Sequence, residues 1–142
     1  MPITDEKLKA TTESFQKLAT DLFEGADDAR KEELLNQLFS SLRGFSRAWR
    51  AETGFGCPAG WTECPDGSCV PPDAGCGGSL DFAKLGKTRE DAFKVLNAYI
   101  EELASSYFAM LKNDQESQEK TRLLFEETLQ KFVSSVNTEI QS

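Results

Sequence analysis

The sequence contains no histidine, and this absence removes the commonest general base and the commonest transition-metal ligand of proteins. Basic residues are also few, since 16 lysines and arginines stand against 24 acidic residues, for a formal net charge of −8. Nucleic acids and anionic membrane surfaces both bind clusters of positive charge, so neither is the expected main partner. No hydrophobic run approaches the roughly 20 residues that cross a bilayer, and we expect no membrane span.

What the chain does contain is enough for one folded domain. Its 142 residues are 39% hydrophobic and 28% charged, which is typical of globular proteins. We expect a single domain over residues 1–142, made of a helical hairpin at 4–54, a cysteine-rich insert at 55–79 and a second helical hairpin at 80–142. The first residues, Met1 to Lys7, include no apolar segment of the kind that a signal peptide requires, so none is expected in this chain.

Apolar residues recur at intervals of three and four over four segments, which predicts four amphipathic helices. The expected helices cover 5–24, 27–53, 88–113 and a segment that starts at residue 114, and short connections join the first to the second and the third to the fourth. We therefore expect an all-α fold, an antiparallel four-helix bundle. The residues that define the apolar faces are Leu8, Phe15, Leu18 and Leu22, then Leu35, Leu38, Leu42, Phe45 and Trp49, then Phe93, Leu96, Ile100, Leu103, Tyr107 and Met110, then Phe125, Leu129, Phe132, Val136 and Ile140.

Three local features refine this prediction. Thr4 is the expected N-cap of the first helix, and Thr88 with Asp91 resembles a capping box at the start of the third. Gly44, in the middle of the second helix, predicts a bend or a close helix crossing there. A short helical turn is expected at 79–85.

All four cysteines lie between the two hairpins, in the segment Cys57-Pro-Ala-Gly-Trp-Thr-Glu-Cys64-Pro-Asp-Gly-Ser-Cys69-Val-Pro-Pro-Asp-Ala-Gly-Cys76. Proline and glycine fill the intervals, so the segment cannot build its own core and needs cross-links or a metal. Structural zinc sites present ligand pairs about two to four residues apart, and only Cys64 and Cys69 come near that spacing. The even number of cysteines favours two disulfides, although spacing alone leaves all three pairings open.

This segment resembles the first half of a low-density-lipoprotein-receptor class A module, on the run Cys57, six residues, Cys64-Pro-Asp-Gly-Ser-Cys69, Val-Pro, four residues, Cys76. The resemblance covers residues 57–76 and implies that the first cysteine pairs with the third, here Cys57–Cys69. The family's second cysteine pairs with a fifth that this chain lacks, which leaves Cys64–Cys76 as the other bond. The family's acidic second half, which binds calcium, is also missing, so calcium binding is not expected. Trp61 stands three residues before Cys64, whereas the family's aromatic stands two before its second cysteine.

Catalytic chemistry has little support in the sequence. A nucleophile needs a base, and without histidine only carboxylates and lysines remain. The pairs Glu101-Glu102 and Glu126-Glu127 resemble ligands of a di-iron bundle, but that site requires a Glu-x-x-His element. We expect no catalytic residues, no metal and no cofactor, and hence no enzyme.

The expected function is that of a non-enzymatic interaction protein, which displays a rigid two-disulfide loop at one end of a helical bundle. The expected partner is a protein, and the three acids of the insert favour a basic surface on it. The expected contact residues are Trp61, Thr62, Glu63, Asp66, Val70 and Pro71. Two alternatives stay open, a carrier of an apolar ligand in the bundle core and an intracellular thiolate protein that binds metal or does redox chemistry with its four cysteines.

Two groups of residues allow two interpretations each. Trp61 either packs on the end of the bundle near Trp49 or Phe55, or is an exposed hot spot for a partner. The arginines at 43, 47 and 50 either complement the dipole of the second helix or anchor an acidic partner. Disulfides imply an extracellular or other oxidising compartment, with any leader already removed, and reduced cysteines would imply the cytoplasm.

Overall fold

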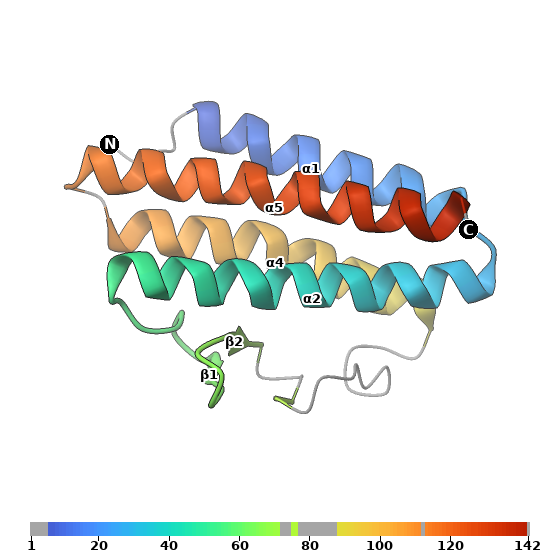
Figure 1. Ribbon diagram of the computed structural model, residues 1–142, viewed down its shortest axis with the longest axis horizontal. Helices are drawn as coiled ribbons and strands as arrows, with labels where there is room; N and C mark the ends of the chain where they lie inside the picture. The colour runs from blue at the N-terminus through green and yellow to red at the C-terminus, as the bar shows by residue number, and fades with distance from the viewer. Residues whose placement is uncertain (1–5, 72–74, 77–87, 112, 142) are drawn as a thin grey trace.

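The structure is an all-α four-helix bundle, as the spacing of apolar residues predicts (Figure 1). This computed structural model describes residues 6–71, 75–76, 88–111 and 113–141, and side chains only as far as residue 136. In this part of the chain the helices are α1 (Glu6–Glu24), α2 (Asp28–Thr53), α4 (Arg89–Met110) and α5 (Gln115–Gln141). The insert between α2 and α4 contributes two strands, β1 (Thr62–Glu63) and β2 (Cys69–Val70).

The helix ends are fixed by capping residues that the sequence shows. Asp27 accepts a hydrogen bond from the backbone N–H of Arg30 at 2.9 Å, and Thr88 accepts one from that of Asp91 at 3.0 Å. Gly54 ends α2 with a φ of 76°, a left-handed conformation that costs glycine little. These caps explain why the predicted bounds of α2 and α4 agree with the structure to within a few residues.

Three finer predictions have other outcomes. The expected cap at Thr4 and the helical turn at 79–85 lie outside the described residues. Of the two outcomes expected at Gly44, a bend or a close helix crossing, the crossing is wrong, because no described residue of another element lies within 4 Å of the place that a Cβ would take there. Gly44 instead lines an open surface groove between α2 and α5.

The two hairpins are antiparallel within themselves, but α2 and α4 run in the same direction (Figure 1). Lys31, near the start of α2, forms an ion pair with Glu90, at the start of α4, with Nζ and Oε1 3.3 Å apart. Trp49, near the end of α2, stacks on Tyr107, near the end of α4. The chain therefore leaves α2 at one end of the bundle and enters α4 at the other, which makes the insert a long crossover connection.

This direction places the described part of the insert, residues 55–71 and 75–76, along the side of the bundle, over α2 and α4 (Figure 1). The sequence-based prediction of a loop at one end was wrong. Its physical reason is that the groups that bind the insert lie on the sides of α2 and α4, mainly along their C-terminal halves, as described below. The fold thus gives the insert a broad helical surface to pack on.

Aromatic rings from all four helices fill the centre of the bundle. Phe15 of α1 stacks between Phe125 and Phe132 of α5, with ring centroids 5.4 and 5.6 Å apart. Phe45 of α2 contacts both Phe125 and Tyr107, at 5.2 and 5.7 Å. All of these rings are at most 2% exposed, and burial of each contributes about 1.5 to 3 kcal/mol of hydrophobic free energy.

Within the described residues, none of the helices combines the length and the apolar character that a membrane-spanning helix needs.

Candidate functional site: the cysteine-rich insert

The insert is built around a tight β-hairpin. β1 pairs antiparallel with β2, with Thr62 opposite Val70 and Glu63 opposite Cys69. At the turn, the N–H of Gly67 donates to the carbonyl of Cys64 at 3.0 Å, and Gly67 has a φ of 91°. This is the geometry of a type I turn followed by a left-handed glycine, which explains the Pro-Asp-Gly run of the sequence.

Two disulfides cross-link the insert to itself. Cys57 is bonded to Cys69 and Cys64 to Cys76, which confirms the pairing that the class A resemblance implies. Each bond spans 12 residues of sequence, and neither reaches a helix. No cysteine is left free, so the structure offers no thiolate to a metal or to redox chemistry. Bonds that close loops of this size stabilise a fold by about 3 kcal/mol in the chain-entropy account.

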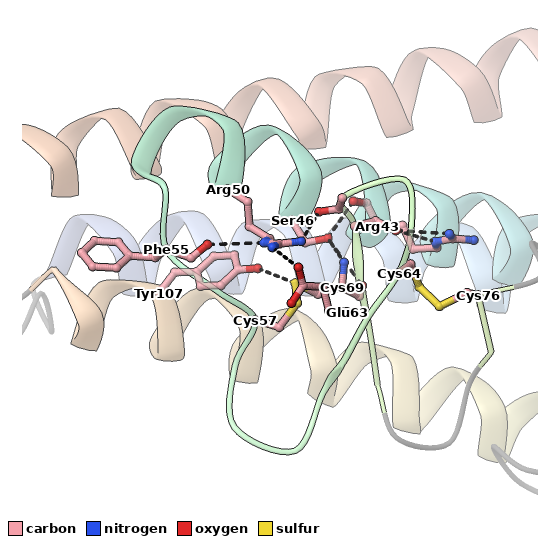
Figure 2. The surroundings of a disulfide bond; sticks show 12 residues. Arg43, Ser46, Arg50, Phe55, Cys57, Glu63, Cys64, Cys69, Cys76 and Tyr107 are labelled. Atoms are coloured by element: carbon pink, nitrogen blue, oxygen red, sulfur yellow. Dashed lines mark hydrogen bonds and ion pairs between the residues drawn. A yellow bond between two sulfur atoms is a disulfide. The ribbon is translucent and has the colours of Figure 1, made fainter.

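Ser46, in the C-terminal half of α2, binds the backbone of the insert directly (Figure 2). Its Oγ accepts a hydrogen bond from the N–H of Cys69 at 2.8 Å and donates to the carbonyl of Arg43 at 2.7 Å. The Cys69 carbonyl lies 3.4 Å from the same oxygen. Ser46 is fully buried. Ser46 is not among the residues expected from the sequence, although a serine between Phe45 and Trp49 on the edge of an apolar face is a signal for such a contact.

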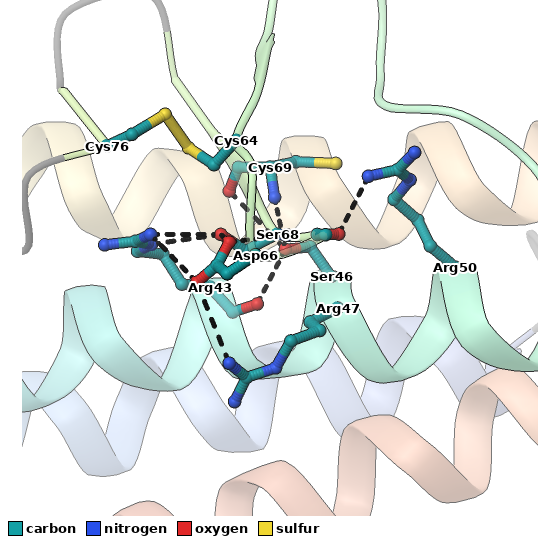
Figure 3. Close-up of polar contacts among 10 residues, drawn as sticks. Arg43, Ser46, Arg47, Arg50, Cys64, Asp66, Ser68, Cys69 and Cys76 are labelled. Atoms are coloured by element: carbon teal, nitrogen blue, oxygen red, sulfur yellow. Dashed lines mark hydrogen bonds and ion pairs between the residues drawn. A yellow bond between two sulfur atoms is a disulfide. The ribbon is translucent and has the colours of Figure 1, made fainter.

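Three arginines of α2 bind two acidic residues of the insert, Asp66 (Figure 3) and Glu63 (Figure 2). The guanidinium of Arg43 donates to Asp66 at 3.2 Å, and that of Arg47 lies 3.7 Å from the same carboxylate. Arg50 donates to Glu63 at 2.5 Å and also to the carbonyls of Gly67 and Phe55. The acidic residues that these arginines bind therefore belong to the insert of the same chain and not to a separate partner.

The charge of Asp66 is stabilised in this arrangement. Hydrogen bonds from the hydroxyl and the N–H of Ser68 hold the pKa of Asp66 below its ordinary value, and the positive charges of Arg43 and Arg47 act in the same direction. The hydroxyl of Ser68 in turn accepts from Arg43 at 3.1 Å. Asp66 thus stays ionised and attached to α2 over the usual range of pH.

The other side of the insert packs on α4. The ring of Trp61 meets that of Tyr99 edge to face at a centroid distance of 5.4 Å, and its Nε1–H donates to Glu102 at 3.1 Å. The hydroxyl of Tyr107 lies 3.5 Å from the Sγ of Cys69 (Figure 2). Trp61 therefore anchors the insert as one interpretation of the sequence expected, but on α4 rather than near Trp49 or Phe55.

The six expected contact residues divide into two groups. Thr62, Glu63 and Asp66 are exposed, whereas Trp61, Val70 and Pro71 are buried against the bundle. The buried three face the helices because the hairpin lies flat on α2 and α4, so in this conformation they do not offer surface to a partner. Val70 is 0% exposed.

Three of the four glutamates that resemble ligands of a di-iron site, all except Glu101, have other partners. Glu102 accepts from Trp61, Glu126 pairs with Arg122, and Glu127 pairs with Lys131. In the ranges that the structure describes, no group of three or more acidic residues or cysteines has the geometry to hold a metal ion.

Comparison with known proteins gives no relative, because no family model, curated protein or solved structure matches the chain.

Proposed function

We propose that the protein is a non-enzymatic binding protein, in which the helical bundle holds the outer side of the cysteine-rich insert in one conformation for a protein partner. The observation that supports this function most directly is the number of independent contacts that immobilise a short hairpin. Two disulfides, the Ser46 contact and three arginines all restrain the residues between 55 and 76. Such restraint lowers the entropy that a loop loses on binding.

The proposed contact surface is the exposed part of the insert. It includes Thr62, with the neighbouring exposed residues Ala59, Gly60 and Pro65. Glu63 and Asp66 belong to it as well, but each already has an arginine partner in α2. A strongly basic partner is therefore less favoured by charge than the sequence alone indicates, since an arginine already offsets part of the charge of each carboxylate.

The disulfides also bear on where such a protein would act. Bonds of this kind persist in oxidising compartments, so we place the protein outside the cell or in another oxidising compartment. Of the two alternative functions, the thiolate protein does not fit a chain whose cysteines are all bonded. The carrier is less favoured, since among the described residues the rings of Phe15, Phe45 and Phe125 fill the centre of the bundle.

A double variant tests the proposal without disturbing the anchors. Ala59→Arg with Thr62→Arg places two bulky charges on the exposed side of the insert, where neither residue makes a described side-chain contact. The matched control, Ala10→Arg with Ser14→Arg, makes the same charge change on the exposed face of α1. Immobilised wild-type protein is used to capture partners from the extracellular fluid of the source organism, and mass spectrometry identifies them.

Affinities of a captured protein are then measured for the wild type and both variants. We expect the insert variant to bind at least about tenfold more weakly and the control to bind as the wild type does, because a bulky charge at the centre of an interface costs more than about 1.4 kcal/mol. Equal affinities for the two variants would show that binding does not use the insert, and the proposed function would be wrong.

A further inference from the structure

The two edges of the β-hairpin differ in their hydrogen bonding. In an antiparallel pair, residues alternate between those whose N–H and C=O point toward the partner strand and those whose groups point away. The N–H of Cys64 donates to the carbonyl of Ser68 at 2.9 Å, so these two residues face each other across the hairpin. The next pair, Glu63 and Cys69, must then direct its backbone groups outward.

The outward groups of Cys69 are occupied. Its N–H donates to Ser46, and its carbonyl lies 3.4 Å from the same hydroxyl, so α2 closes the edge of β2. This contact is independent support for the alternation, because a Cys69 N–H that pointed at β1 would not reach α2.

The outward groups of Glu63 are not occupied. Among the residues that the structure describes, neither its N–H nor its carbonyl has a hydrogen-bond partner, and both Thr62 and Glu63 are exposed. The strand is held rigidly on both sides of this position, by the Cys64–Cys76 bond and by Trp61 on α4. An immobile, exposed donor and acceptor on one edge of a strand match the backbone of another extended chain.

We infer that the partner binds by adding an extended peptide segment to the free edge of β1, with its own N–H and C=O paired to those of Glu63. This inference rests on the proposed function and names the chemistry of its contact. The strand is two residues long, so the added segment is short. The side chains beside Glu63 then select among peptide segments of different sequence.

Charge decides between a partner protein and a second copy of this chain. If β1 paired with β1 of another copy about Glu63, the two Glu63 carboxylates would lie opposite each other, and like charges in that position destabilise a strand pair. The net charge of −8 adds to the repulsion. A segment with a basic or neutral residue opposite Glu63 meets no such cost.

A pair of substitutions at residue 63 isolates the backbone N–H. Glu63→Pro removes both the N–H and the carboxylate, whereas Glu63→Ala removes only the carboxylate and its ion pair with Arg50. Proline is tolerated on an edge strand, and Thr62 before it already has an extended conformation. Far-UV circular dichroism and a count of free thiols confirm that both variants are folded and oxidised.

The probes are linear peptides of about eight residues, selected from a displayed random library on the immobilised full-length oxidised chain, and any partner captured as described above. We expect these probes to bind Glu63→Pro about tenfold more weakly than Glu63→Ala, as the loss of the one backbone hydrogen bond that the N–H donates predicts. We also expect them to slow hydrogen exchange of the Glu63 N–H, which should be fast in the free protein while those of Cys64 and Cys69 are slow.

Three results would overturn the inference. These are a library without a binder, probes that bind the two variants equally, and a Glu63 N–H whose exchange no probe slows. A dimer in sedimentation whose formation Glu63→Pro prevents would make a second copy the occupant, against the charge argument. A captured partner that is lost on Ala59→Arg with Thr62→Arg yet binds Glu63→Pro normally would leave the proposed function standing and remove only this contact.

Discussion

The indole of Trp49 lies flat on the phenol ring of Tyr107, with ring centroids 3.6 Å apart and planes that differ by 1°. This stack joins α2 to α4 in the core, and each residue also reaches a second element. The Nε1–H of Trp49 donates to Thr121 of α5 at 2.8 Å, while the hydroxyl of Tyr107 meets the Cys57–Cys69 bond of the insert. The stacked rings of Trp49 and Tyr107 thereby connect the core of the bundle to the insert.

The first prediction concerns alkaline pH. Burial raises the pKa of Tyr107 well above its ordinary value of 10, and the nearby positive charge of Arg50 opposes this only in part. Below pH 10 this tyrosine is neutral in both the folded and the unfolded chain, so its ionisation does not lower the free energy of unfolding. As pH rises above 10 only the unfolded chain ionises it, and the free energy of unfolding falls. We expect the free energy of unfolding to fall by about 1 kcal/mol between pH 10 and 11 on this account.

Urea denaturation at several pH values between 8 and 11 measures this loss. Tyr107→Phe keeps the ring stack and removes the ionisable group, so its free energy of unfolding should depend less steeply on pH. An identical pH dependence in the variant would contradict the assignment.

The second prediction concerns Ser46. Its replacement by alanine leaves the buried N–H of Cys69 without a partner, which should lower the free energy of unfolding by about 1 to 3 kcal/mol. Ser40, an exposed serine of the same helix, is the control, and Ser40→Ala should change stability by less than about 0.5 kcal/mol. Chemical denaturation measures both, and similar values for the two variants would show that the Ser46 contact contributes nothing.

The third prediction compares two arginines one turn apart. Arg50 donates to two backbone carbonyls and to Glu63, and its side chain is only 19% exposed. Arg47 has one ion pair at 3.7 Å and a side chain that is 59% exposed. Arg50→Ala should accelerate hydrogen exchange of insert amides such as that of Cys64, whereas Arg47→Ala should have little effect, because exposed ion pairs contribute little. Equal exchange rates in the two variants would contradict this ranking.

The fourth prediction concerns the disulfides. Alkylation of the unreduced chain under denaturing conditions should label no cysteine, and proteolysis should recover Cys57 linked to Cys69 and Cys64 linked to Cys76. Replacing Cys64 and Cys76 by alanine should lower stability by about 2 to 4 kcal/mol and leave the helical signal unchanged, because neither bond reaches a helix. Four labelled cysteines would contradict the cross-linked insert.

The sequence predicts the helices well because their ends carry local signals. Asp27, Gly54 and Thr88 act on backbone groups within three or four residues, and the apolar spacing reports which face is buried. The same spacing does not indicate the relative direction of two helices, since an apolar face packs against a parallel helix as well as against an antiparallel one. This is why the parallel course of α2 and α4, and with it the site of the insert, was not predicted.

The contacts of the insert show a similar limit. The type I turn follows from Pro-Asp-Gly, and the class A resemblance gives the disulfide pairing. The sequence predicts that Trp61 packs on residues near it in sequence. Its partners Tyr99 and Glu102 lie about forty residues away and are brought near only by the crossover. Likewise the sequence leaves Glu63 and Asp66 available to a partner, whereas in the fold the arginines of α2 bind both.

The two sides of the hairpin differ in how freely their residues can be substituted. Substitutions at Val70 or at the β2 edge would disturb the bundle, because that edge is bonded to Ser46 and that side chain is buried. Changes at Thr62 or Ala59 meet only solvent. Mutations can therefore accumulate on the outer side with little loss of stability, and under the proposed function one bundle could acquire new specificities through a few residues of a single exposed strand and its flank.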